Sequence, residues 1–323
     1  MSSAWVEPDK RDQVVDFVEY WSGRAEINRR QLLQFAQISR SRYYDWRQRY
    51  GKVNEHNAMV PRDHWLEQWE QEAIIAWFKN HPLEGYRRLT YMMMDAEVVF
   101  ASPSSVYRVL RNEGLLDRWN RKPSKKGTGF VQPLAVHAHW HIDISYLNLG
   151  GTFYYLCCVL DGCSRFIVEW DIKSSMKEAD VELVLQRAKE RYPDASPRII
   201  SDNGPQFIAR DFKEFVRLSG MTHVRTSPYY PQSNGKIERF HKTIKSNHIR
   251  QQQFDSFDQM KKSVGEYIEF YNTARLHSAI DYVTPQQKLN GEEATIFKQR
   301  EDNLNDAREA RKQRRRQARE HVA

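Results

Sequence analysis

The stretch that decides the fold is residues 139–172, HWHIDISYLNLGGTFYYLCCVLDGCSRFIVEWDI. It contains three runs rich in β-branched and aromatic residues, and such runs are typical of strands. Gly150-Gly151 and Asp161-Gly162 separate the runs, and dipeptides of this kind mark tight turns between neighbouring strands. We therefore predict three consecutive strands, over residues 139–147, 153–160 and 165–172.

The chain that follows this stretch alternates between helical and extended patterns. Apolar residues at helical spacing predict helices over residues 177–191, 206–219 and 235–249. Short apolar runs predict two more strands, over residues 198–202 and 221–226. This element order is that of an RNase H-like fold, so we expect an α/β fold class with a mixed five-stranded sheet flanked by helices. Two long helices are expected after it, over residues 255–273 and 285–316.

The first part of the chain is expected to be all-α. Helices are predicted over residues 8–22, 27–36 and 39–50. The third helix has Ser39 as its N-cap and Gly51 just beyond its end. It carries Arg40, Arg42 and Arg47, and in a helix-turn-helix it would enter the major groove. An ordinary three-helix bundle with a basic face explains the same pattern equally well.

A second helical unit follows. Its helices are predicted over residues 64–80, 86–96 and 102–112. The first of them places Trp65, Trp69 and Trp77 on one stripe, which we interpret as part of a core. We interpret the unit as helix-turn-helix-like.

The charge distribution favours a polyanionic partner. The chain has 50 Lys and Arg against 42 Asp and Glu, for a net charge of +8. The basic residues gather in three blocks, at residues 118–126, 225–250 and 308–319. Phosphate binding explains the three blocks together better than solvated helix faces do.

Neither a membrane protein nor a secreted protein is expected. The longest apolar run, residues 153–160, is far shorter than the ~20 residues of a membrane helix. The N-terminus lacks the basic, apolar and small-residue pattern of a secretory signal. Three Cys are too few for a disulfide framework, and we expect Cys157 and Cys158 to be buried strand residues in a cytoplasmic protein.

Three acidic residues stand where a metal site could form. Asp143 lies inside the first strand, although Asp is a poor strand former. Asp202 ends the fourth strand, and Glu238, with 35 residues between the two, lies in the first turns of a helix. Each acid alone has an ordinary explanation as a turn former, a helix-terminus charge or a surface charge. The three together, with a basic helix after Glu238, are a more specific pattern.

Six motifs occur in the order found in one family. They are ISRSRYYDW (38–46), EGYRRLTYMM (84–93), HIDISY (141–146), SDNGPQF (201–207), SPYYPQSNGKIERFHKTIK (227–245) and YNTARLHSAIDYVTP (271–285). In these motifs the chain resembles bacterial insertion-sequence transposases with a retroviral-integrase-type, or DDE, catalytic core. The resemblance covers nearly the whole chain. Leu276 and Ile280 stand where many relatives have Pro and Leu, and neither departure touches the three acids.

The resemblance implies an enzyme that binds the terminal repeats of an insertion sequence and catalyses metal-dependent DNA nicking and strand transfer. Asp143, Asp202 and Glu238 would be both the catalytic residues and the ligands of two Mg²⁺ (or Mn²⁺) ions, with Asp143 bridging the two. Two hard cations stabilise charge on the attacking and leaving oxygens of a phosphodiester. Water and then a 3′-hydroxyl would attack, so no covalent enzyme intermediate is required.

Candidate DNA contacts surround the three acids. Lys242 and Lys245 follow Glu238 by four and seven residues, and therefore share its helix face. The resemblance places Lys245 against DNA phosphates, and His241 is a weaker candidate for a role near the acids. The remaining candidate DNA contacts are Asn203, Gln232, Asn234, Arg40, Arg42, Arg47, Arg118, Arg121 and Lys122.

The resemblance and the composition together predict five segments. They are a helix-turn-helix DNA-binding domain (1–60), a second helical domain (61–117), a basic linker (118–134), an RNase H-like catalytic core (135–252) and a helical extension with a basic tail (253–323). The expected partners are double-stranded DNA, both terminal inverted repeats and target DNA, and a second copy of the chain. We expect at least a dimer on DNA, associated with the bacterial nucleoid and not with a membrane.

Three alternatives remain at this point. His137, His139 and His141 alternate with Asp143 along one strand face and could bind a transition metal. The chain could instead be a catalytically idle DNA-binding protein derived from a transposase, although the presence of all three acids argues against that. It could also be an RNase H-like nuclease that only hydrolyses, which the surrounding motifs disfavour.

Overall fold

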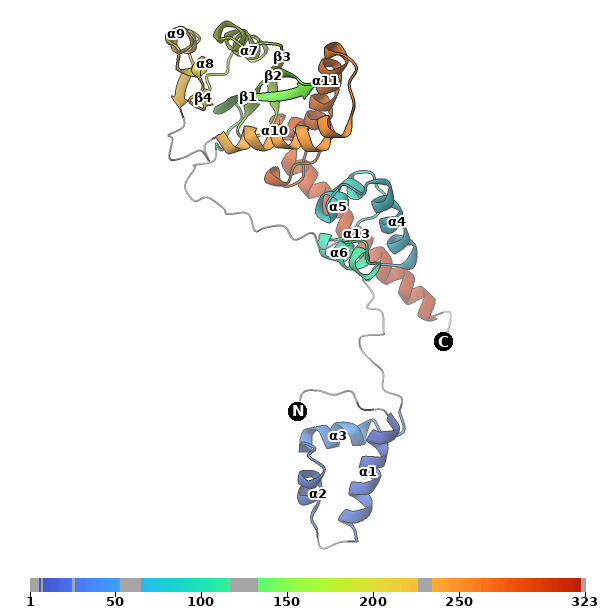
Figure 1. The fold of residues 1–323 in the computed structure, drawn as a ribbon. Coiled ribbons are helices and arrows are strands. Elements are labelled where there is room, and N and C mark those ends of the chain that lie inside the picture. Colours follow the sequence, from blue (N-terminus) through green and yellow to red (C-terminus); the bar gives the residue numbers. More distant parts are fainter. Residues whose placement is uncertain are drawn as a thin grey trace. The chain divides into compact units, whose positions relative to one another are not determined.

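The computed structural model describes residues 6, 8–24, 27–52, 65–116, 133–225 and 234–320. The chain divides into two compact units, Met1–Trp65 and Leu66–Ala323. Figure 1 labels the helices and strands of both units. Most of the segment predicted to be a basic linker, residues 118–134, lies outside the described residues.

The N-terminal unit contains three helices around a small apolar core. They are α1 (Pro8–Ser22), α2 (Arg29–Phe35) and α3 (Arg40–Gln48). The Asn28 side chain forms a capping box with Gln31 at the start of α2. The Ser39 hydroxyl accepts the amide of Arg42 at the start of α3, as its N-cap position predicts. The buried residues of this core are Val15, Val18, Leu33, Tyr43 and Trp46.

The second unit begins with three more helices. They are α4 (Gln68–Asn80), α5 (Tyr86–Asp95) and α6 (Pro103–Asn112). Their core includes Ile74, Leu89, Met93, Val106 and Leu110. The predicted tryptophan stripe is only partly core, because the Trp69 side chain is 53% exposed and its Nε1 donates to Glu67 at 2.8 Å. Trp77 does pack against the core.

A five-stranded mixed sheet forms the centre of the second unit and confirms the predicted fold class. Its strands are β1 (His139–Leu149), β2 (Thr152–Asp161), β3 (Ile167–Lys173), β4 (Arg198–Ser201) and β5 (Thr222–Arg225). The strand order is β3-β2-β1-β4-β5. The pairs β1/β2 and β2/β3 are antiparallel, and β1/β4 and β4/β5 are parallel.

Helices cover both faces of the sheet (Figure 1). They are α7 (Glu178–Arg191), α8 (Pro205–Ile208), α9 (Arg210–Leu218), α10 (Gly235–Asn247) and α11 (Phe257–Thr273). Cys157 belongs to the core that the sheet forms with α7 and α9, whereas Cys158 belongs to the core formed with α10 and α11. Neighbouring strand residues point to opposite faces, so both thiols are buried, as predicted.

Two helices predicted as continuous are interrupted. The helix predicted over residues 206–219 is two helices, because Ala209 adopts an extended conformation between α8 and α9. The Glu178 carboxylate of α7 accepts the amide of Phe212 at 2.8 Å and so satisfies the new start of α9. The helix predicted over residues 285–316 is α12 (Pro285–Leu289) and α13 (Glu293–Glu320), separated at Gly291, whose φ is +74°.

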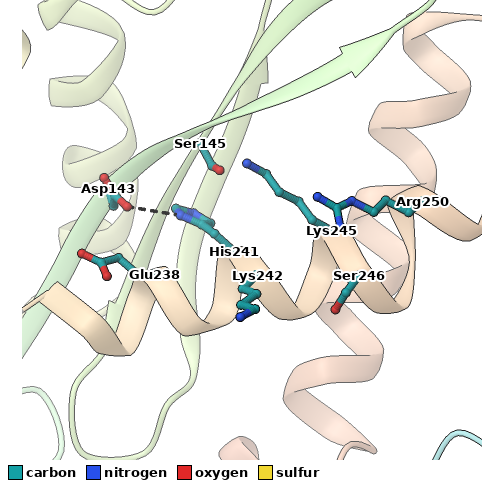
Figure 2. A pocket seen from close by; sticks show the side chains of 8 residues that line it. All are labelled: Asp143, Ser145, Glu238, His241, Lys242, Lys245, Ser246 and Arg250. Atoms are coloured by element: carbon teal, nitrogen blue, oxygen red, sulfur yellow. Dashed lines mark ion pairs between the residues drawn. The ribbon is translucent and has the colours of Figure 1, made fainter. Parts of the chain in front are cut away.

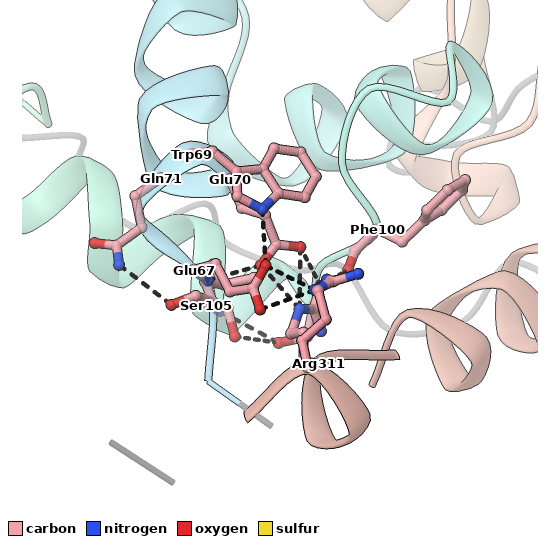
Figure 3. Close-up of polar contacts among 10 residues, drawn as sticks. Glu67, Trp69, Glu70, Gln71, Phe100, Ser105 and Arg311 are labelled. Atoms are coloured by element: carbon pink, nitrogen blue, oxygen red, sulfur yellow. Dashed lines mark hydrogen bonds and ion pairs between the residues drawn. The ribbon is translucent and has the colours of Figure 1, made fainter. Parts of the chain in front are cut away.

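The C-terminal helix α13 is joined to α4 and α5 by ion pairs. The Arg311 guanidinium donates to both Glu70 carboxylate oxygens, at distances of 2.7–3.0 Å, and both side chains are buried (Figure 3). Arg300 binds Asp95 of α5 at 2.6 Å. Although α13 has 28 residues, neither it nor any other helix in the described ranges is long and apolar enough to cross a membrane.

Candidate active site

The register of the sheet aligns two of the three predicted acids. Asp143 lies in β1, and Asp202 follows Ser201, the last residue of β4. The two strands are parallel neighbours, and His141 is opposite Ile200 in their register. Continuing this register by two residues places Asp143 opposite Asp202.

Glu238 approaches from the first turn of α10. Buried Ile237, Phe240 and Ile244 on the opposite helix face fix α10 against the sheet. Asp143 and Glu238 line one cavity of about 370 Å³ (Figure 2). The other residues that line it are Ser145, His241, Lys242, Lys245, Ser246 and Arg250. Asp202 is exposed and is not part of this lining.

The three carboxylates nevertheless act on one another. Partial burial raises the pKa of Glu238, and the charges of Asp143 and Asp202 raise it further. Crowded negative charge of this kind is relieved by a cation, and carboxylate oxygens are ligands that Mg²⁺ prefers. The donor atoms are therefore of the kind that a divalent metal binds. Over the described ranges, however, no three His, Cys, Asp or Glu side chains are grouped closely enough to hold a metal ion.

His241 is in direct contact with one of the acids. Its Nδ1 lies 3.3 Å from Asp143 Oδ2, and the imidazole is buried. The other oxygen, Asp143 Oδ1, accepts the amide of Ile144 at 2.9 Å. The Asp143 carboxylate is thus held from both sides. Sequence reasoning assigned this histidine only a weak role, because nothing in the helical spacing indicates which neighbour of Glu238 faces β1.

The cavity also has a basic end. Lys242 and Lys245 both line the cavity, as their shared helix face with Glu238 predicts. Burial lowers the pKa of Lys245, the nearby Arg250 lowers it further, and Asp143 acts in the opposite direction. Sequence reasoning missed Ser145 and Arg250 as lining residues. The basic block at residues 225–250 includes Arg250. Arg250 is twelve residues after Glu238 and lies beyond the end of α10, so helical spacing does not relate it to Glu238.

The three Asn and Gln side chains predicted to contact DNA have different surroundings. Asn203 is exposed beside Asp202. Asn234 is buried, and its Nδ2 donates to the carbonyl of Ile142 at 3.3 Å, so the side chain ties the start of α10 to β1. Gln232 lies outside the described residues.

The predicted DNA contacts of the N-terminal unit are on α3. The Arg40 and Arg47 side chains are exposed, and the Arg42 guanidinium lies over the Trp46 ring, 5.1 Å from its centroid. Arg47 Nε lies 3.3 Å from a Glu19 carboxylate oxygen, so part of its charge is compensated. Arg118, Arg121 and Lys122 fall in the part of the chain that the structure does not describe.

The alternative metal site along β1 does not form. His137 precedes the strand and accepts a hydrogen bond from Trp140 Nε1 at 3.1 Å. His141 is buried, with its Nδ1 facing the Asn234 side chain. Burial lowers the pKa of His141 to about 3, and Lys236 adds to the shift. These histidines therefore serve packing and hydrogen bonding.

Comparison with known proteins identifies the central part of the chain. Two family models described as integrase core domain match residues 133–231 and residues 219–285. The transposase of insertion sequence element IS904 from Lactococcus lactis is 29% identical over 231 residues, which cover 67% of this chain and 91% of the relative. Transposase InsD of insertion element IS2 from Escherichia coli is 29% identical over 224 residues, covering 64% of this chain and 74% of that protein.

One similar solved structure is a simian T-cell lymphotropic virus intasome in complex with the PP2A regulatory subunit B56 gamma. It aligns with this chain at a TM-score of 0.45 and 18% identity. The alignment covers 67% of this chain and 74% of that chain. The family models and the curated relatives agree with each other and with the mixed sheet described above. Residues 133–285 thus match the integrase core domain, and the chain is similar over about two thirds of its length to transposases of bacterial insertion sequences.

Proposed function

We propose that this chain is a transposase that binds the terminal repeats of its insertion sequence, nicks the DNA there and joins the released 3′ end to target DNA. The observation that carries the proposal is the two-sided cavity of Figure 2. Asp143 and Glu238 line one side of it, and Lys242 and Lys245 line another. A phosphodiester requires both kinds of group, since its transfer needs a metal held by carboxylates and cations that bind its charge.

Asp143, Asp202 and Glu238 are the proposed catalytic residues and would hold two Mg²⁺ or Mn²⁺ ions. When bound, these ions supply charge stabilisation to the attacking and leaving oxygens. The raised pKa of Glu238 supports the assignment, because beyond the effect of partial burial it includes repulsion by the charges of Asp143 and Asp202.

The chain's own residues then orient and bind. His241 fixes one oxygen of Asp143, and Lys242 and Lys245 attract the phosphate backbone to the cavity. Water is the nucleophile of the nicking step and leaves a 3′-hydroxyl, which attacks a target phosphodiester in the second step. The bond broken in each step is a P–O bond of DNA, so we expect no protein–DNA adduct.

Recognition of the DNA ends is assigned to the helical segments. The exposed Arg40 and the basic face of α3 are the proposed contacts in the N-terminal unit, with Arg118, Arg121 and Lys122 as further candidates. Two ends must be held for one transfer, so we propose at least a dimer on DNA. A bacterial nucleoid is the setting that this activity requires.

The test uses the full chain, a labelled duplex carrying the element's own end, and Mg²⁺. We expect nicking at the element boundary and joined strand-transfer products, both lost in Asp143→Asn and in Asp202→Asn. Cleavage without joined products would identify a hydrolytic nuclease instead. DNA binding without cleavage in the wild-type chain would identify an idle DNA-binding derivative. Cleavage that survives in either variant would overturn the carboxylate assignment.

A further inference from the structure

One end of the cavity is built from three different elements. Lys245 comes from the last turn of α10, and Ser145 comes from β1. Arg250 comes from the short 3₁₀ helix η2 (Ile249–Gln251) that follows α10. In Figure 2 the Arg250 side chain extends toward Lys245, and the Lys245 side chain extends toward Ser145. The electrostatic effect of Arg250 on Lys245 supports this proximity.

The turn that carries Arg250 is held in place. α10 ends at Asn247, and His248 leaves the helical conformation, with φ −135° and ψ −67°. The His248 ring stacks on Tyr267 of α11, with ring centroids 4.7 Å apart, and its Nε2 lies 2.8 Å from Ser263 Oγ. These contacts fix the direction in which the chain leaves α10. Arg250 is therefore presented to the cavity by a packed turn and not by a free loop.

The charges at this end are only partly compensated, because Asp143 acts on Lys245 without forming an ion pair with it. Several basic side chains of this unit do have acidic partners, as Lys261 has Asp171 at 2.9 Å and Arg314 has Glu67 at 3.0 Å. In the parts of the chain that the structure describes, Lys245 and Arg250 form no ion pair within 4.0 Å. Two neighbouring cations repel, and an anion bound to both removes the repulsion. The site thus has the chemistry of an anion subsite.

We propose that Lys245, Arg250 and the Ser145 hydroxyl form a second phosphate subsite, which holds the DNA phosphate next to the one that is transferred. The inference rests on the proposed function, because it takes the carboxylate end as the place of the transferred phosphate. It adds Arg250 and Ser145 to the substrate-binding residues. A planar guanidinium suits this task, since it can donate two parallel hydrogen bonds to one phosphate.

The experiment measures DNA binding without divalent metal, so that it does not depend on catalysis. The DNA ends carry a single uncharged methylphosphonate, moved one position at a time across the cleavage site. The proteins are the wild-type chain, Arg250→Gln, and Arg217→Gln as a matched control on the exposed face of α9. Arg250→Lys tests whether charge alone suffices.

For the wild-type chain, we expect a methylphosphonate at one position next to the scissile phosphate to weaken binding about tenfold, the size of one charge-assisted hydrogen bond. In Arg250→Gln the same methylphosphonate should have no further effect, and the log–log salt slope should fall by about 1. The control should keep the wild-type pattern. Arg250→Lys should restore part of the affinity.

Two outcomes would overturn the subsite. One is an Arg250→Gln variant that responds to every methylphosphonate as the wild-type chain does. The other is a loss of affinity spread evenly over all positions with a lowered melting temperature, which would mean that Arg250 only supports the fold. If the position-specific effect is present but the wild-type chain does not cleave in Mg²⁺, the subsite stands and the proposed function fails.

Discussion

The Asp143 carboxylate has a different neighbour on each oxygen. Oδ1 accepts the amide of Ile144, and Oδ2 lies 3.3 Å from the Nδ1 of His241. A residue that orients a metal-binding carboxylate sets its direction without touching the substrate, and its loss typically costs 10–100-fold in activity or metal affinity. His241 is therefore expected to be a positioning residue.

We predict that His241→Ala lowers the single-turnover cleavage rate by about 10–100-fold and raises the Mg²⁺ concentration needed for half-maximal rate. DNA binding without metal should be unchanged, because His241 does not provide the charge that binds DNA. Thr243→Ala, on the same helix but outside the cavity lining, is the control. An unchanged metal dependence would show that the His241–Asp143 contact has no role in the site.

The raised pKa of Glu238 predicts a pH-dependent stability difference. In the folded protein a carboxyl with a raised pKa is more stable protonated than ionised. Its contribution to stability is therefore fully present below its pKa in the unfolded chain, and it is lost as pH rises through its pKa in the folded protein. Glu238→Gln removes the repulsion. The variant should melt slightly above the wild-type chain at about pH 7, with little difference at about pH 4.

The effect should be small, because the Glu238 side chain is exposed and solvent screens its charge. Thermal melts of the two proteins across this pH range measure it. Glu214→Gln, at an exposed position of α9, is the control and should show no comparable trend. A wild-type chain that melts above Glu238→Gln at about pH 7 would contradict the repulsion.

At the scale of elements, the sequence predicted those features that depend on hydrophobic periodicity and on the order of the motifs. The three-strand stretch, the mixed sheet and the place of Glu238 early in a helix all follow from residue type and spacing. The break at Gly291 has a local signal in the glycine itself, whose φ is +74° and whose amide bonds back to Lys288 of α12. The break at Ala209 does not, because it depends on the Glu178 carboxylate of a neighbouring helix. Arg250 was missed for the same reason, since it lines the cavity only because α10 ends at Asn247.

Asn272, the second residue of the motif YNTARLHSAIDYVTP (271–285), has a structural role in the sheet. Asn272 of α11 is buried, its Oδ1 accepts the amide of Ile167 at 2.9 Å, and its Nδ2 donates to the carbonyl of the same residue at 3.0 Å. The side chain thus acts as a strand partner for the first residue of β3. An isosteric apolar residue would leave both backbone groups of Ile167 buried without these hydrogen bonds.

We predict that Asn272→Leu destabilises the protein by about 1–3 kcal/mol, the cost of leaving buried polar groups unsatisfied. Denaturant unfolding followed by circular dichroism measures the loss. Thr273→Ala, one residue on and with its hydroxyl bonded only within α11, should cost less. Equal losses for the two variants would mean that the link between α11 and β3 contributes little.

At the scale of the second unit, the motifs EGYRRLTYMM (84–93) and YNTARLHSAIDYVTP (271–285) contact each other. Arg88 Nε donates to the carbonyl of Leu276 at 2.8 Å, and Arg275 lies 3.5 Å from the Glu84 carboxylate. The Tyr91 and Tyr282 rings stack with centroids 4.8 Å apart. The segment EGYRRLTYMM, predicted to be part of a helix-turn-helix, thus also joins α5 to the chain segment that follows α11.

The C-terminal helix α13 also binds this helical region, through an ion pair with α4. Arg311 and Glu70 are each about 3% exposed, so their charges compensate each other in a site nearly free of water. Removing one partner of a buried ion pair leaves the other charge unpaired, which typically costs about 3–5 kcal/mol. The pair Arg314–Glu67 is much more exposed and should contribute at most about 1 kcal/mol.

We therefore predict that Arg311→Ala destabilises the unit by about 3–5 kcal/mol, whereas Arg314→Ala costs about 1 kcal/mol or less. Hydrogen exchange should become faster in α4 and α6, which pack near this pair (Figure 3). The double variant Arg311→Met with Glu70→Met should recover much of the loss, since no charge is left buried. If the double variant is as unstable as Arg311→Ala, packing of the long side chains and not charge compensation holds α13 in place.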